Sequence, residues 1–167
     1  MEPQKPSKKT GAEPLCDLEV PMINSIVTSM AEQHRRLDDL AARLAFAATR
    51  LLSGIDASAA MSQTRELRDE IRRELWSHLQ IESELVFAWA QAHHALVPEL
   101  VETLREEQQQ IGELVAEISP PDPETASGEQ RERFARTMLA LAGMLDSHVS
   151  RYDSEVLPTI LRAVFSE

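Results

Sequence analysis

The sequence predicts an all-α fold, an antiparallel up-down four-helix bundle, and three observations lead to this prediction. No proline occurs between Pro21 and Pro98, and Gly54 is the only glycine within residues 22–97, so breaks are few in this part of the chain. The stretches between the breaks are rich in Ala, Leu, Glu, Arg and Gln, which favour helix. Their apolar residues recur at intervals of three and four, whereas no stretch shows the sustained alternation of a β-strand. Long amphipathic helices joined by short links are typical of an antiparallel bundle.

The first two predicted helices span residues 21–53 and 57–94. Pro21 suits the first turn of a helix, where its missing N–H is not needed. The segment 53–56, Ser-Gly-Ile-Asp, predicts a helix end followed by the cap of the next helix. Trp76 is expected to be a core side chain, as is Trp89. The apolar stripes of the two helices comprise Val27, Met30, Leu37, Ala41 and Leu44 in the first, and Leu67, Ile71, Leu75, Leu85 and Trp89 in the second.

The third and fourth predicted helices span residues 97–118 and 128–165. The proline-rich segment 119–128 between them predicts a loop. Ser127 is followed three residues later by Gln130, which predicts a capping box at the start of the last helix. The apolar stripes comprise Leu100, Leu104, Ile111, Val115 and Ile118 in the third helix, and Phe134, Met138, Leu141, Leu145 and Val156 in the fourth.

Composition divides the chain into two parts. Residues 1–20 are expected to form a disordered or loosely packed tail, because this segment holds three of the nine prolines and three lysines but few large apolar side chains. Residues 21–167 are expected to form one bundle domain, since their length suffices for a single hydrophobic core.

Charge and cysteine content exclude several classes of protein. The net charge of −11 argues against binding to nucleic acid or to an anionic membrane surface, both of which require basic residues. The single cysteine, Cys16, excludes an intrachain disulfide and a cysteine-based metal site. No apolar run approaches the roughly 20 residues that span a bilayer, and no secretory signal is visible. A cytoplasmic location is therefore expected.

Polar side chains interrupt each apolar stripe near the middle of its helix. These are His34, His78, Glu82, Gln108 and His148. Positions along the bundle axis can be compared by counting residues from the connecting turns. By this count His34 is level with His78, and Glu82 is level with Gln108. His148 reaches the same level if the proline-rich loop spans roughly 14 Å along the axis, at 1.5 Å per residue. One histidine on an apolar stripe is more often a hydrogen-bonded core residue than a metal ligand. Three histidines at one height, with a carboxylate one turn beyond the second, favour a metal site. The other two histidines, His93 and His94, are expected at a solvated turn.

Three motifs together resemble the hemerythrin family, specifically the bacterial hemerythrin-like HHE cation-binding domains. Residues 33–37, Gln-His-Arg-Arg-Leu, are similar to the first-helix motif of that family, with Gln for Glu. Residues 78–87, His-Leu-Gln-Ile-Glu-Ser-Glu-Leu-Val-Phe, resemble its H-x-x-x-E motif and trailing aromatic. Residues 148–153, His-Val-Ser-Arg-Tyr-Asp, resemble the closing motif, and Pro158 follows near the helix end. The resemblance covers about residues 22–165 and implies a hemerythrin-like bundle.

The resemblance also implies a ligand set. His34, His78 and His148 would be nitrogen donors to non-heme iron, and Glu82 and Asp153 would be carboxylates that bridge two iron ions. Manganese or zinc would suit the same donor types.

The third helix departs from the pattern of the resembled family. Gln108 stands where the family has a histidine, and Leu104 stands where some members have a second one. Tyr152 occupies a position that often holds a glutamate. Glu107 is a candidate substitute carboxylate, because it too lies one helical step from Leu104. One occupied metal position, a loosely held second ion and a site adapted to another ligand all remain open.

Two functions from different classes follow. The first is a hemerythrin-like metal-binding protein, possessing one or two iron ions, that binds or senses oxygen, nitric oxide or iron itself. The alternative is a metal-free degenerate bundle that acts as a protein-interaction or regulatory module. An enzyme is not predicted, because no nucleophile or general base is visible apart from the candidate ligands.

Overall fold

A computed structural model describes residues 20–122 and 124–165, so residues 1–19 of the predicted tail at 1–20 lie outside this range, and Val20 begins α1. All regular secondary structure in the described residues is helical, which confirms the all-α prediction. The elements are α1 (Val20–Leu52), α2 (Ala57–Ile81), a π-helical segment (Glu82–Phe87), α3 (Ala88–Ala92), α4 (Pro98–Glu117), α5 (Gly128–Arg151), a second π-helical segment (Tyr152–Val156) and α6 (Leu157–Phe165).

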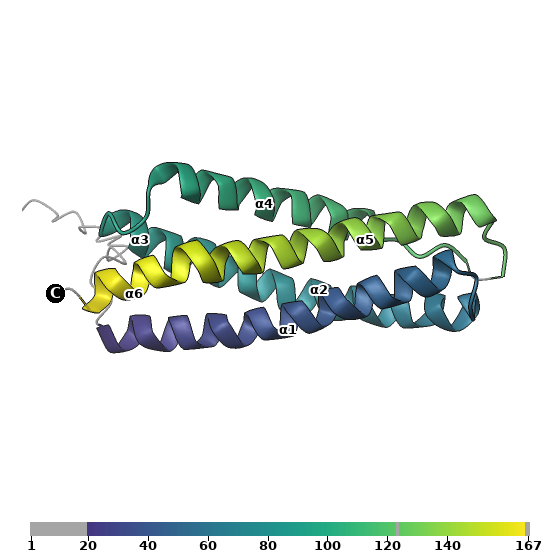
Figure 1. Ribbon diagram of the computed structural model, residues 1–167, viewed down its shortest axis with the longest axis horizontal. Coiled ribbons are helices and arrows are strands. Elements are labelled where there is room, and N and C mark those ends of the chain that lie inside the picture. The colour runs from purple at the N-terminus through teal and green to yellow at the C-terminus, as the bar shows by residue number, and fades with distance from the viewer. Residues whose placement is uncertain (1–19, 123, 166–167) are drawn as a thin grey trace, which may run out of the picture.

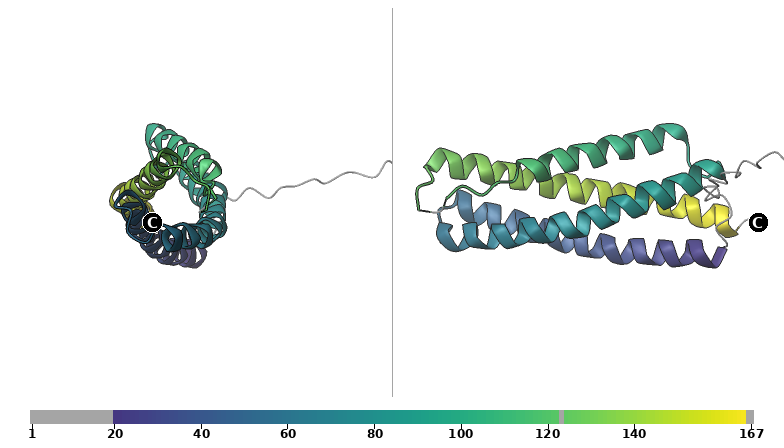
Figure 2. Two further views of the ribbon diagram at one scale, coloured as in Figure 1. Left: turned by 90° about the vertical axis from the view of Figure 1, so that its right-hand side faces the viewer. Right: turned by 180° about the vertical axis from the view of Figure 1, so that it is seen from behind.

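The described elements form four continuous helical rods that lie side by side in an antiparallel bundle (Figure 1). The second rod runs from α2 through its π-helical segment into α3, and the fourth runs from α5 through its π-helical segment into α6. The view along the bundle shows the rods arranged around a common centre (Figure 2). The α1 helix packs along α2 and α5, whereas α4 packs mainly on α5 and touches α2 at few positions.

Local sequence signals account for most helix ends. Ser127 Oγ accepts a hydrogen bond from the backbone N–H of Gln130 at 3.1 Å, and Gln130 Oε1 accepts one from the backbone N–H of Ser127 at 2.8 Å, so the predicted capping box is confirmed. Gly54 adopts a φ of 69° in the turn after α1, a conformation that glycine tolerates. Asp56 is the N-cap residue of α2, as predicted, but its side chain makes no cap hydrogen bond, because its carboxylate pairs with Arg50 at 2.9 Å.

Trp76 was expected in the core, and the structure contradicts this. Its surface is 75% exposed, whereas Trp89 is 5% exposed. Leu75 occupies the core position, and the next residue on an α-helix is rotated by about 100° from it. Trp76 therefore stands outside the stripe.

The buried interior is divided along the bundle axis. One apolar cluster lies in the half that ends at the turns after α1 and α4, and it includes Leu44, Leu67 and Leu141. The other lies in the half that contains α3 and α6, and it includes Phe87 and Ile160. Between the two clusters lies what we call the polar layer, a set of buried polar side chains comprising Gln33, His34, His78, Glu82, Glu107 and His148. No helix in the described part of the chain is both long and apolar enough to cross a membrane.

Candidate metal centre

The polar layer brings together side chains that are far apart in the sequence. His34 comes from α1, His78 from α2, Glu82 from the π-helical segment that follows, and His148 from α5. The ring centroids of His34 and His78 are 4.9 Å apart, and those of His78 and His148 are 5.7 Å apart. All four residues are at most 1% exposed, so the cluster lies in a dry environment.

Each of these histidines has its Nδ1 atom held by a polar partner. The three hydrogen bonds are His34 Nδ1 to Asp153 Oδ1 at 2.8 Å, His78 Nδ1 to Gln33 Oε1 at 3.3 Å, and His148 Nδ1 to Glu107 Oε2 at 3.3 Å. All three partners are acceptors, so each Nδ1 carries the proton and donates. Histidines that bind a metal through Nε2 are commonly oriented by such a hydrogen bond at the other ring nitrogen.

The Nε2 atoms of two of these histidines, His78 and His148, lie close to the Glu82 carboxylate. Glu82 Oε2 lies 3.1 Å from His148 Nε2 and 3.6 Å from His78 Nε2. One ligand atom each from His78, Glu82 and His148 can be chosen so that all three lie within 4.8 Å of one another. This grouping has the size and the donor types of a metal site.

Several buried polar atoms in this cluster have no hydrogen-bond partner among the described residues. They are His34 Nε2, His78 Nε2, Glu82 Oε1 and Tyr152 Oη. A buried polar atom left without a partner costs about 1–3 kcal/mol, so a protein rarely retains several at one place. A cation would satisfy the two nitrogens and the carboxylate oxygen together, and the residues present therefore fit a metal ion.

Burial and charge set different protonation states for two of the histidines. Burial lowers the pKa of His78 to about 2, with smaller contributions from repulsion by the neighbouring His34 and His148, so its imidazole is neutral and available as a donor. Burial would also lower the pKa of His148. Hydrogen bonds and attraction to Glu82 and Glu107 outweigh that effect and raise the pKa above its usual value. A cation bound at His148 Nε2 would therefore displace a proton.

Tyr152 is a site residue whose role the sequence analysis missed. Its side chain is fully buried and packs edge-on against the His34 ring, with centroids 4.6 Å apart. Burial, and then the charges of Glu82 and Asp153, raise its pKa well above the usual value, so the group is a neutral phenol that can donate a hydrogen bond. Its position four residues after His148, on the same apolar stripe, is the feature of the sequence that could have identified it as a site residue.

Both rods that carry the H-x-x-x-E and closing motifs change from α-helix to π-helix at the polar layer. A step of four residues on an α-helix advances by about 40° beyond a full turn, so several such steps in a row would carry a stripe off the core face. The buried positions after His148 follow four such steps, at Tyr152, Val156, Ile160 and Val164. The wider turn of the π-helix keeps them on one face, and π-helical turns occur frequently at functional sites. The run of apolar or aromatic positions spaced four apart after His148 is the feature of the sequence that could have indicated a π-helical turn.

Asp153 and Gln108 occupy positions that differ from those expected of ligands. The Asp153 side chain is half exposed and accepts the hydrogen bond from His34 Nδ1, so it lies on the outer side of that ring. The Gln108 side-chain amide donates to Glu82 Oε2 at 2.6 Å, and its oxygen accepts from Ser83 Oγ at 3.0 Å. Both side chains thus contact candidate ligands and hold them in position.

The α4 helix contributes supporting contacts. Glu107, considered as a substitute carboxylate ligand, lies between His148 Nδ1 and Arg151 Nε, which donates to it at 2.8 Å. Leu104 is fully buried and apolar. His93 and His94 are exposed at the turn before α4, as expected.

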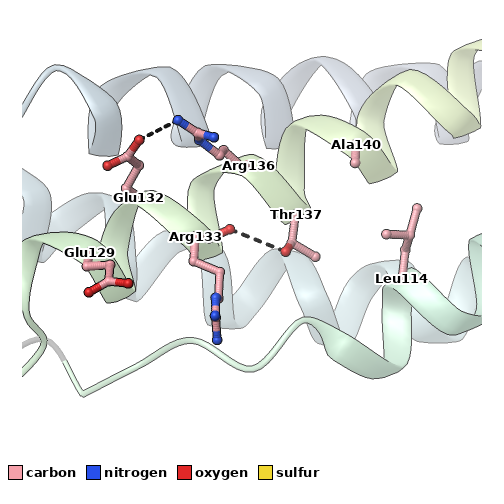
Figure 3. A pocket seen from close by; sticks show the side chains of 7 residues that line it. All are labelled: Leu114, Glu129, Glu132, Arg133, Arg136, Thr137 and Ala140. Carbon is pink, nitrogen blue, oxygen red and sulfur yellow. Dashed lines mark hydrogen bonds and ion pairs between the residues drawn. The ribbon is translucent and has the colours of Figure 1, made fainter.

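A hollow near the start of α5 is a weaker candidate for a functional site (Figure 3). Its charged side chains include Glu132 and Arg136, which pair with each other at 2.6 Å, and Thr137 donates to the backbone carbonyl of Arg133. These groups are solvated or already partnered. The hollow therefore lacks the unsatisfied buried atoms that mark the polar layer.

Comparison with known proteins agrees with this geometry. Residues 25–160 match the family described as "Hemerythrin HHE cation binding domain", and these residues include the whole polar layer and most of each of the four rods. No curated protein and no solved structure gave a match. The chain belongs to the hemerythrin HHE cation-binding domain family.

Proposed function

We propose that this protein binds one divalent metal ion in the polar layer, with His34, His78, His148 and Glu82 as its ligands. The observation that carries the proposal is the common orientation of the three histidines. Each Nδ1 is held by an acceptor, and Glu82 contacts the Nε2 atoms of His78 and His148. The unpartnered Nε2 atoms of His34 and His78 support the same conclusion.

Iron is the metal we propose, with manganese and zinc as alternatives. Three imidazoles and one carboxylate are donors that all three metals accept, and geometry and availability decide between them. Ferrous iron would supply affinity for a small diatomic molecule such as oxygen or nitric oxide. The chain contributes the buried surroundings and the Tyr152 hydroxyl, a hydrogen-bond donor with no partner among the described residues. We propose that the protein binds or senses such a molecule, or iron itself.

We propose one ion instead of two because the α4 side chains at the layer are already engaged or apolar. Glu107 accepts hydrogen bonds from His148 and Arg151. Gln108 presents a neutral amide that already binds Glu82, and Leu104 is apolar. Asp153, the expected second bridging carboxylate, orients His34 in the structure.

The proposal is tested by measuring metal content in histidine variants. Protein purified without chelators from medium supplied with iron, manganese and zinc should contain about one ion per chain. His34→Ala, His78→Ala and His148→Ala should each weaken the affinity at least about tenfold, because each removes a ligand. His93→Ala and His94→Ala are matched controls, since both residues are exposed and outside the layer.

Elemental analysis and a competitive titration measure the outcome, and circular dichroism establishes that each variant remains helical. Equal metal content in all five variants would contradict the proposed ligands. A wild-type protein that takes up no metal under any of these conditions would favour the alternative, a bundle that acts as an interaction module.

Gln108→His should increase metal binding. The Gln108 amide nitrogen lies 2.6 Å from Glu82 Oε2, so a histidine there would place an imidazole beside the same carboxylate. Imidazole is a far better donor to iron or zinc than a neutral amide. We expect the metal content to rise from one ion toward two, measured by elemental analysis. Gln109→His is the control, because Gln109 is exposed and binds Glu113. An equal increase in both variants would show that the added ion binds at the surface.

A further inference from the structure

A groove separates α2 from α4 on the outer side of the bundle. Its volume is about 560 Å³, which is within the usual range for small-molecule sites of about 300–1,000 Å³. Leu75 and Leu79 of α2 and Val115 of α4 contribute apolar walls. The groove exists because these two helices touch at few positions.

Gly112 keeps the α4 wall of the groove open. A Cβ atom added at this glycine would meet nothing within 4 Å, so the space beside the helix is empty. Glycine in the middle of a helix costs about 0.5–1 kcal/mol relative to alanine. A side chain at this position would enter the groove without displacing another group.

Two side chains at the rim indicate what the groove would bind. Trp76 is 75% exposed beside the apolar walls, and its ring offers a flat surface for stacking. Arg72 lies one helical turn before Trp76 and also lines the groove. Its guanidinium makes no hydrogen bond or ion pair with any described residue, whereas Arg36, Arg43 and Arg50 each pair with a carboxylate. An unpaired guanidinium beside an apolar surface favours an anionic group.

We propose that this groove is a binding site for a flat aromatic anion, such as an aromatic carboxylate, whose ring stacks on Trp76 and whose charge pairs with Arg72. The volume suits a small molecule, and Arg72 supplies the local positive charge that an anion requires on a chain of net charge −11. Gln108, which donates to Glu82, also lines the groove. Binding in this groove does not require a metal ion in the polar layer, so the test of this proposal is independent of the test of the proposed metal function.

Two fluorescent probes that differ in one charged group test this proposal. The anionic probe is 8-anilinonaphthalene-1-sulfonate, and the neutral probe is N-phenyl-1-naphthylamine, which has the same rings without the sulfonate. Full-length wild-type protein should bind one molecule of either probe saturably, with energy transfer from tryptophan. Arg72→Gln should weaken binding of the anionic probe about five- to tenfold and leave the neutral probe unchanged, because only the charged contact is lost.

Matched variants separate this site from general surface binding. Arg73→Gln removes an adjacent exposed arginine that does not line the groove, and it should change neither affinity. Gly112→Leu should weaken binding of both probes at least about tenfold by filling the groove, without lowering the melting temperature. Equal effects of Arg72→Gln and Arg73→Gln on the anionic probe would overturn the proposal. Unchanged binding in Gly112→Leu, or no saturable binding in the wild type, would also overturn it.

Discussion

Glu82→Gln should weaken metal binding by more than about 100-fold, which makes it the most damaging conservative substitution in the chain. The carboxylate is fully buried, and Oε2 contacts both His148 and His78 while Oε1 has no partner. Glutamine preserves the size and can still accept a hydrogen bond, but it removes the negative charge that offsets a divalent cation. Loss of an outer partner of a metal ligand costs about 10–100-fold in affinity, and loss of the only charged ligand should exceed that. Competitive titration against a chelating dye measures the change.

Glu84→Gln is the matched control for this substitution. Glu84 lies two residues farther along the same π-helical segment, but it is exposed and only accepts hydrogen bonds from Gln80 at 3.4 Å. The affinity of the Glu84→Gln variant for metal should remain within about twofold of that of the wild type. If both variants lost metal equally, binding would depend on the general acidity of the surface, and the polar layer would not be the site.

Metal loading should raise the free energy of unfolding by about 4 kcal/mol when the free ion is at 1,000 times its dissociation constant, because only the folded chain assembles the ligands. For a domain of this size that corresponds to an increase in melting temperature of about 8–16 °C. Calorimetry of chelator-treated and reloaded protein measures the shift. We expect a large increase in the free energy of unfolding when metal binds in the polar layer, because the unpartnered atoms there lower stability until a cation satisfies them.

The same loading experiment on Glu82→Gln distinguishes this site from others. The variant should show little stabilisation at the ion concentration that saturates the wild type. A shift of equal size in both proteins would place the stabilising ion elsewhere, for example at the exposed His93 and His94, and would contradict the proposed centre.

Residue spacing was sufficient to predict the four rods, and the structure brings His78, Glu82 and His148 together with the His34 ring beside that of His78. Helical rise and short turns determine height along a bundle, and intervals of three and four determine the face. The phase of α4 was harder to predict. Glu107 and Gln108 both lie one helical step from Leu104 and from Ile111, so spacing cannot choose between them. The structure buries Glu107 in the layer, where Arg151 and His148 donate to it, and leaves Gln108 partly buried.

The partners of the histidine Nδ1 atoms were also beyond the sequence analysis. They depend on side-chain rotamers, which the spacing of residues along the sequence does not determine. The family resemblance implied the Asp153 carboxylate as a bridging ligand, whereas in the structure it accepts the hydrogen bond from His34 Nδ1. Trp76 shows a simpler limit, because a large aromatic side chain next to a core position need not share its face.

The polar layer has a consequence for cooperativity. It crosses all four rods, so each half of the bundle has a separate apolar core to which every rod contributes. The two halves are coupled through the continuous helices and through the hydrogen bonds of the layer. In the absence of a cation, we expect amide exchange at the layer to be faster than at the other buried positions of the bundle, because its unpartnered polar atoms lower the cost of local opening. A bound ion would join side chains from three rods and suppress this opening, so that occupancy of the centre becomes detectable as slower exchange in both halves of the bundle.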